Sequence, residues 1–128
     1  MKVLIDTNRY RDFCSADRQT VDWFQRAEEI CLPFVCLAEL RAGFLCGTKA
    51  RSNESVLTRF LNRSRVRVLY PDEHTTHHYA HIFHQLRVQG TPIPTNDIWI
   101  AALAVQHDLY LLSRDRHFDR LPQIPRLN

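Results

Sequence analysis

The sequence is poor in glycine and has no long apolar run. It contains three glycines and six prolines in 128 residues, which leaves no room for a low-complexity tract. No apolar stretch approaches the roughly 18 to 20 residues that span a membrane, so we predict no membrane association. The apolar run at residues 2–5 stops at Asp6 and is too short for the core of a signal peptide. We therefore expect a cytoplasmic protein that is mature from its first residue.

The cysteines lack the spacing of a metal site. The four of them form no C-x-x-C pair and no zinc pattern; they are Cys14, Cys31, Cys36 and Cys46. An even count permits disulfides, but we interpret these residues as reduced thiols that mostly fill the core. The net charge of +3 is mildly basic, which is compatible with a nucleic-acid partner but does not by itself indicate one.

Short apolar runs alternate with longer helical patterns. Strands are predicted at residues 2–5, 30–35, 66–69, 109–112 and, at the C-terminus, 124–127. Helices are predicted at residues 17–28, 48–62, 72–89, and from residues 37 and 95 onward. A polar turn is expected after Asp6, and Pro33 predicts a second strand that is short, kinked or at an edge. The alternation predicts a single domain over residues 1–128, an α/β fold that we take as a three-layer α/β/α sandwich with a central, mainly parallel sheet.

The most informative stretch runs from Pro94 to Ala102. Proline disfavours helix in the residue before it, so Thr95 is predicted as the N-cap of a new helix. Asp97 then lies in the first turn, where the helix dipole favours a negative charge. Helical spacing predicts a buried face made of Ile98, Ala101, Ala102 and Val105. By itself, Asp97 is explained well enough as a capping residue.

Three further acids have related positions. Asp6 and Asp115 each follow an apolar strand, whereas Glu39, like Asp97, stands near the start of a helix. In a parallel sheet these ends lie on the same edge. Carboxylates that converge there repel one another unless cations neutralise them, and an all-oxygen site suits Mg²⁺, with Mn²⁺ as a substitute. The pattern predicts metal-assisted hydrolysis of a phosphodiester.

The helix at residues 72–89 is rich in histidine. Four histidines have the spacing of one helical face: His74, His77, His78 and His81. Histidines at i and i+4 can bind a metal. The opposite face is predicted to be the buried one, and it consists of Tyr79, Ile82, Phe83 and Leu86. We therefore interpret the histidines as solvent-facing, without a native metal role.

The sequence resembles the PIN-domain ribonucleases, and among them the VapC-type toxins of prokaryotic toxin–antitoxin pairs. The resemblance covers nearly the whole chain, and four segments carry it: Leu4-Ile5-Asp6-Thr7-Asn8, Leu37-Ala38-Glu39-Leu40 with Gly43, Pro94-Thr95-Asn96-Asp97-Ile98-Trp99-Ile100-Ala101-Ala102, and Leu112-Ser113-Arg114-Asp115-Arg116-His117-Phe118. Each segment is weak alone, but their order and spacing make the match specific. The chain departs from the family at Tyr10-Arg11, where more apolar residues are usual, and at Pro33.

The resemblance implies a Mg²⁺-dependent endoribonuclease that acts on tRNA, rRNA or mRNA. It implies that the catalytic and metal-binding acids are Asp6, Glu39, Asp97 and Asp115. The supporting residues are expected to be Thr7, Asn96 and Ser113. It also implies a homodimer, inhibited by a small VapB-type antitoxin in a heterotetramer or larger complex. Three arginines flank Asp115 and are predicted either to bind RNA phosphates or to be simply solvated; they are Arg114, Arg116 and Arg120.

Three alternatives compete with this interpretation. A phosphohydrolase of the haloacid dehalogenase class needs a second Asp two residues after the first, where this chain has Asn8, and a downstream lysine, whereas Lys49 is its last lysine. A PIN nuclease that processes RNA without being a toxin has the same acids. A non-catalytic binding module of the same fold is disfavoured because all four acids are present.

Overall fold

The computed structural model describes residues 1–127 and contains one five-stranded sheet. The strands, in chain order, are β1 (Lys2–Ile5), β2 (Glu29–Pro33), β3 (Val66–Leu69), β4 (Tyr110–Leu112) and β5 (Arg126–Leu127). Their spatial order is β3-β2-β1-β4-β5, and every neighbouring pair is parallel. All five strands were predicted. β1, β2 and β4 contain uninterrupted buried apolar residues, as expected for strands covered on both faces. The second strand ends two residues earlier than predicted, because Phe34 and Val35 begin α3.

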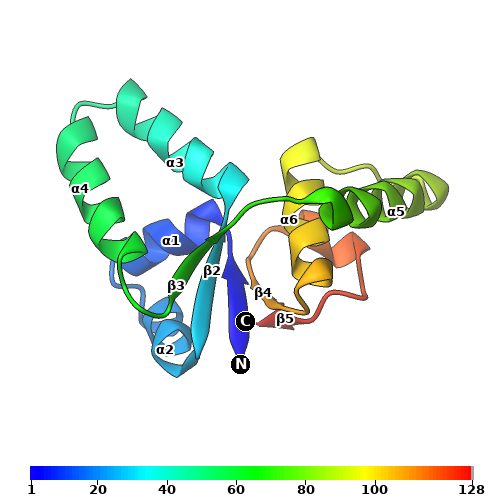
Figure 1. Cartoon of the computed structure of the whole chain (residues 1–128), viewed down its shortest axis with the longest axis horizontal. Helices are drawn as coiled ribbons and strands as arrows, with labels where there is room; N and C mark the ends of the chain where they lie inside the picture. Colours follow the sequence, from blue (N-terminus) through cyan, green and yellow to red (C-terminus); the bar gives the residue numbers. More distant parts are fainter. Residues whose placement is uncertain (128) are drawn as a thin grey trace.

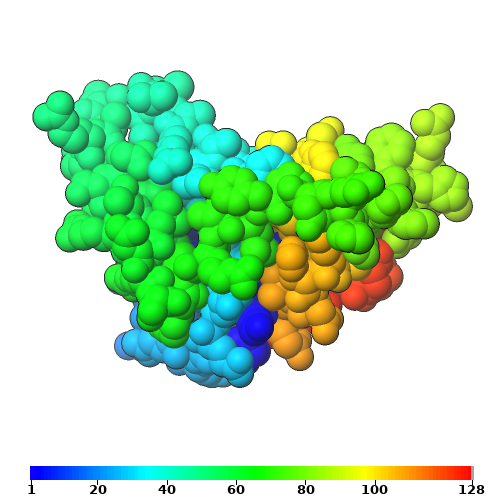
Figure 2. Space-filling model, in the orientation of Figure 1, coloured from blue at the N-terminus to red at the C-terminus, as the bar shows by residue number. Residues whose placement is uncertain are grey.

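The helices form a layer on each side of the sheet (Figure 1). One layer contains α1 (Thr7–Cys14), α2 (Arg18–Arg26), α3 (Phe34–Cys46) and α4 (Ala50–Leu61). The other contains α5 (Glu73–Gln89) and α6 (Thr95–Gln106). In the space-filling view, α3 and α4 (cyan to green) lie on the left and α6 (yellow to orange) lies on the right (Figure 2). A short 3-10 helix, η1 (Arg116–Arg120), follows β4. The predicted three-layer α/β/α sandwich is therefore confirmed.

The chain changes direction across the sheet once, and this positions the site. It steps from β1 to β2 to β3, then returns past β1 to β4. Because crossovers between parallel strands are right-handed, the helices after β3 lie on the opposite face from those before it. The strand order reverses between β1 and β4. Ligands bind at such switch points, beyond the carboxyl ends of the strands, and Asp6 and Ser113 directly follow those two strands.

The core is densest around the two central strands. Val3, Leu4 and Ile5 are fully buried, as are Leu111 and Leu112. Beneath α1–α4 the core is aromatic: the rings of Phe13 and Phe24 stack at 4.6 Å, and the ring of Tyr10 meets that of Phe60 edge-on at 5.1 Å. Beneath α6 it is made of small and aliphatic side chains, Ala101, Ala102 and Leu103. No helix within residues 1–127 is both long and apolar enough to cross a membrane.

Two helix starts differ from the prediction. The expected polar turn after Asp6 is the first turn of α1, because the Asp6 carboxylate accepts a hydrogen bond from the Arg9 backbone N–H at 2.9 Å and so caps the helix. Thr95 is not the N-cap of α6. Pro94 holds that position and Thr95 is the first helical residue, with no side-chain cap bond.

Several burial predictions also need correction. β2 is an interior strand, and Pro33 is tolerated because it is the last residue of that strand, next to the start of α3. Phe83 is 47% exposed and Val105 is 36% exposed, since neither the sheet nor a helix covers those sides of α5 and α6 completely. Cys14 and Cys46 are exposed, so only half of the free cysteines fill the core.

Candidate metal centre

The four predicted acids line one pocket of about 130 Å³ at the sheet's switch point. Asp6 comes from the end of β1, Glu39 from α3, Asp97 from the first turn of α6, and Asp115 from the loop after β4. Thr7 lines the same pocket. The parallel topology brings together residues that are up to 109 positions apart in the sequence, between Asp6 and Asp115. Asp119 follows Asp115 by four residues, but it pairs with Arg126 at 3.0 Å and does not line this pocket.

Asp6 is the most buried of the acids, at 8% exposure. One carboxylate oxygen accepts the Arg9 N–H, and the other accepts the Ser113 hydroxyl at 2.5 Å. Burial raises the pKa of Asp6 above its usual range, the two hydrogen bonds oppose that rise, and the charge of Asp115 adds to it. Ser113, one of the residues predicted as supporting, thus holds one oxygen of Asp6, and the Arg9 N–H holds the other.

Glu39 joins three elements. Its Oε2 accepts the Thr7 hydroxyl at 2.8 Å, and its Oε1 accepts the Asn96 side-chain amide at 3.0 Å. Thr7 is the first residue of α1 and Asn96 lies in the first turn of α6. The two residues predicted as supporting therefore orient Glu39 from opposite sides. Cys36 lines the pocket nearby, and burial raises its pKa to about 12, so its sulfur remains a neutral thiol.

Asp97 and Asp115 share a histidine that the sequence did not single out as functional. His117 Nδ1 lies 2.6 Å from Asp97 Oδ2 and 3.2 Å from Asp115 Oδ1. The backbone N–H of His117 also donates to Asp115 Oδ1 at 2.9 Å. Burial raises the pKa of Asp97; the His117 contact opposes the rise, and Asp115 and Glu39 reinforce it. The position of His117, two residues after an expected ligand, was the available signal.

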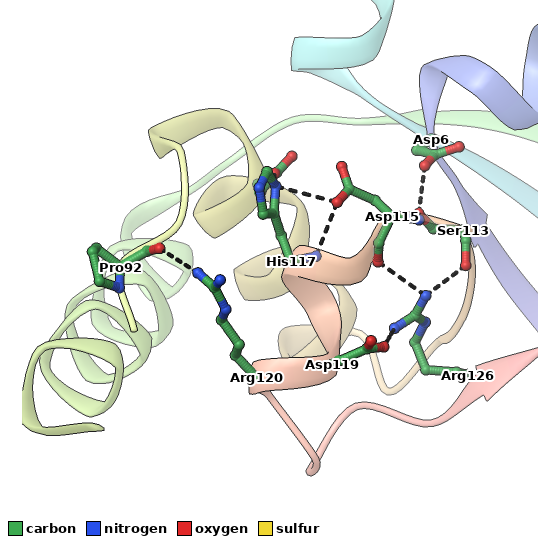
Figure 3. A network of polar contacts seen from close by, with 9 residues as sticks. Asp6, Pro92, Ser113, Asp115, His117, Asp119, Arg120 and Arg126 are labelled. Carbon is green, nitrogen blue, oxygen red and sulfur yellow. Dashed lines mark hydrogen bonds and ion pairs between the residues drawn. The ribbon is translucent and has the colours of Figure 1, made fainter. Parts of the chain in front are cut away.

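The loop that carries Ser113, Asp115 and His117 is anchored from β5 (Figure 3). Arg126 donates from Nη2 to the carbonyl oxygens of Ser113 and Asp115, at 2.6 and 3.2 Å. The Ser113 hydroxyl also accepts the Asp115 N–H at 3.0 Å. Arg126 of β5 therefore holds the backbone of the loop from which these side chains project.

The three arginines predicted as an RNA-binding rim have different surroundings. Arg114 pairs with Asp12 of α1. Arg120 donates to the carbonyl oxygen of Pro92 at 2.7 Å and points away from the acids (Figure 3). Arg116 is exposed at the start of η1. Because two of the three already have intramolecular partners, their contact with RNA stays a prediction.

The donor set fits a hard divalent cation. Carboxylate oxygens dominate the pocket, and Mg²⁺ prefers such ligands. Within the described residues, one carboxylate oxygen of Asp97 and one of Asp115 accept no hydrogen bond. One donor atom each from Asp97, Asp115 and His117 lies within 4.8 Å of the other two. The imidazole nitrogen is a ligand that transition-metal ions accept more readily than Mg²⁺ does.

A comparison with known families finds a match over most of the chain. A model of the PIN domain matches residues 3–124. The chain belongs to the PIN-domain family. The predicted resemblance is thereby confirmed, since the match includes all four segments that suggested it.

The relatives of this PIN domain are ribonucleases of the VapC type. The chain is 31% identical to Ribonuclease VapC4 of Mycobacterium tuberculosis over 90 residues, which are 70% of this chain and 69% of that protein. It is 32% identical to Ribonuclease VapC1 of Haemophilus influenzae over 98 residues, 76% of this chain and 72% of that protein. A crystal structure of DNA-bound VapBC from Salmonella typhimurium aligns with a TM-score of 0.87 and 26% identity, covering 99% of this chain and 97% of that one.

Proposed function

We propose that this PIN domain, residues 1–128, is a Mg²⁺-dependent endoribonuclease and the toxin of a toxin–antitoxin pair. One observation carries the proposal: Asp6, Glu39, Asp97 and Asp115 line a single pocket at the switch point of a chain related to VapC ribonucleases. A pocket with this much negative charge binds an RNA phosphate poorly unless a cation is present. Mn²⁺ is the expected substitute.

The four carboxylates would hold the ion, which when bound supplies a Lewis acid and lowers the pKa of bound water. The surrounding residues prepare those ligands. Ser113 orients Asp6, and Thr7 and Asn96 orient Glu39. The burial that raises the pKa values of Asp6 and Asp97 also strengthens their attraction for a cation.

The partners of this chain are inferred from a related toxin–antitoxin complex. The Salmonella structure is a VapBC complex with DNA, so we expect a VapB-type antitoxin for this chain, in a complex built on a VapC homodimer and therefore a heterotetramer or larger. The antitoxin would restrain a nuclease that meets RNA in the cytoplasm. The target, whether tRNA, rRNA or mRNA, is to be read from the 5′ ends that appear after brief expression.

The test compares wild type with Asp97→Asn, which removes one charge and keeps the side-chain shape. Purified wild type should cleave RNA with Mg²⁺ or Mn²⁺ and stop in chelator, and Asp97→Asn should lose cleavage by about 100-fold or more. Asp22→Asn, an exposed acid of α2, is the matched control and should cleave like wild type. If Asp97→Asn cleaves RNA as fast as the control does, the acids are not catalytic.

Toxicity is tested separately. Expression of wild type should arrest growth, and expression of Asp97→Asn should not. If both proteins cleave nothing but the wild type still binds RNA, the chain is a binding module. If wild type cleaves RNA without arresting growth, it is a PIN nuclease of RNA processing.

A further inference from the structure

Arg11 is the cation at the edge of the acid pocket. It lies on α1, and it is the positively charged residue among those that line the pocket. Its side chain is exposed, and its guanidinium makes no hydrogen bond or ion pair within residues 1–127. Arg11 is neither a metal ligand nor a support of one among the residues assigned to the ribonuclease site.

A second, larger hollow adjoins the acid pocket at Arg11. It has a volume of about 580 Å³ and lies between α1, α3 and α4; we call it the α1–α3–α4 groove. Its walls include Tyr10, Gly43, Phe44, Asn53 and Val56. Arg11 lines both hollows, so the guanidinium stands where the groove meets the acids.

Gly43 lies beside the Arg11 guanidinium. A Cβ on Gly43 would be 3.5 Å from Arg11 Nη2, which is ordinary van der Waals contact. Because glycine has no side chain, position 43 leaves this side of the guanidinium uncovered. The Arg11 guanidinium and the α1–α3–α4 groove beside it thus form one site.

The chemistry of the groove suits a nucleotide. Its volume falls within the roughly 300 to 1,000 Å³ typical of small-molecule sites. The ring of Phe44 offers a stacking surface. The exposed Asn53 side chain, which makes no hydrogen bond within the described chain, carries the donors and acceptor that read a base edge.

We propose that the α1–α3–α4 groove binds the nucleotide next to the scissile phosphate, and that Arg11 contacts the phosphate of that nucleotide. The inference rests on the proposed ribonuclease function. RNA entering an acidic pocket needs a cation at its mouth, because the carboxylates repel its backbone until a metal ion neutralises them. Arg11 supplies that cation on the α1 side, and the continuous groove determines where the adjoining base goes.

The first experiment measures RNA affinity for Arg11→Gln in an Asp97→Asn background that cannot cleave. Single-stranded RNA is titrated with Mg²⁺ present, across a range of salt concentrations. We expect Arg11→Gln to lower affinity roughly fivefold and to make the salt slope shallower by about 0.7, the loss of one phosphate contact on single-stranded RNA. Arg18→Gln, an exposed arginine at the start of α2, is the matched control and should change neither quantity.

The second experiment blocks the groove without changing its charge. Val56 is 40% exposed, so Val56→Trp is expected to fold, which circular dichroism checks. It should lower RNA affinity about as much as Arg11→Gln does while leaving the salt slope unchanged. Asn53→Ala should change the base preference beside the cut, because the amide is the group proposed to read that base. Mn²⁺ affinity, followed by electron paramagnetic resonance, should not fall in any of these variants.

The outcomes separate the two proposals. If wild type cleaves RNA, but both Arg11→Gln and Val56→Trp bind RNA like wild type, the groove inference is overturned and the ribonuclease proposal stands. If those variants weaken only the complex with the antitoxin, the groove is an antitoxin surface and the inference is again wrong. If wild type neither binds nor cleaves RNA, the proposed function fails, and the inference fails with it.

Discussion

Ser113→Ala tests whether the site is organised before any metal binds. The Ser113 side chain is fully buried; it donates to Asp6 at 2.5 Å and accepts the Asp115 N–H at 3.0 Å. A hydrogen bond to a charged group contributes about 1.5–3 kcal/mol, and a neutral one about 0.5–1.5 kcal/mol. The substitution removes one of each and leaves only a small void. We therefore expect it to lower the free energy of unfolding by about 2–4 kcal/mol at neutral pH.

The cost should depend on pH in a definite direction. Burial raises the pKa of Asp6, and the Ser113 bond opposes that rise, so losing the bond raises the pKa further. The substitution has its full cost only above the pKa that Asp6 has in the variant, because the carboxylate is then ionised in both proteins. As the pH falls through that pKa and then through the lower pKa of the parent, the cost shrinks to that of a neutral bond.

Urea unfolding of metal-free protein, at pH 7.5 and at several lower values down to about 3.9, the ordinary pKa of an aspartate, measures this dependence. Asp6→Asn is the control background: there the cost of Ser113→Ala should be smaller and independent of pH, since no charge titrates at position 6. An equal cost at every pH in the parent would refute the argument that Ser113 acts on a buried, ionised Asp6.

Three further predictions address the remaining contacts of the site and its support. Arg126→Ala removes the two hydrogen bonds to the loop carbonyls and should lower the free energy of unfolding by about 1–3 kcal/mol. It should also weaken Mg²⁺ binding, which calorimetry measures; unchanged Mg²⁺ binding would show that the loop holds its shape without the arginine. Thr75→Val removes the buried hydroxyl that donates to Gln106 and so joins α5 to α6; thermal unfolding should show a loss of about 1–3 kcal/mol, with RNA cleavage intact. His117→Ala removes the imidazole nitrogen beside Asp97 and should reduce the preference for Mn²⁺ over Mg²⁺ in competition binding; an equal change for both ions would mean that the nitrogen is not a ligand.

Much of the fold and of the candidate site follows from local patterns in the sequence. Apolar runs that are continuous rather than alternating predict strands covered on both faces, and their alternation with helices predicts a parallel sheet. The position of Asp6 at the end of one such run was enough to place it at the sheet edge. The convergence of four acids was predictable because parallel strands and the helices that follow them share that edge.

Other features depend on which elements meet. Asp6 and Thr95 show the limit at short range: the polar residues after β1 fit a turn as well as a helix start, and only the capping bond from Arg9 decides between them. Pro33 predicted a second strand that is short, kinked or at an edge, and only the structure shows that β2 is an interior strand with Pro33 as its last residue.

The sequence alone therefore predicted the layers and the edge of the sheet, because the period of apolar residues marks each strand and helix. It also predicted which acids reach that edge, because they stand where those elements end or begin. Only the tertiary structure decided the partners of those acids. His117 approaches Asp97 across twenty positions, and Arg126 holds a loop that precedes it by more than ten. Arg11 lies where the acid pocket meets the α1–α3–α4 groove because three helices come together there. Such contacts depend on how helices from different parts of the chain pack, which no single segment encodes.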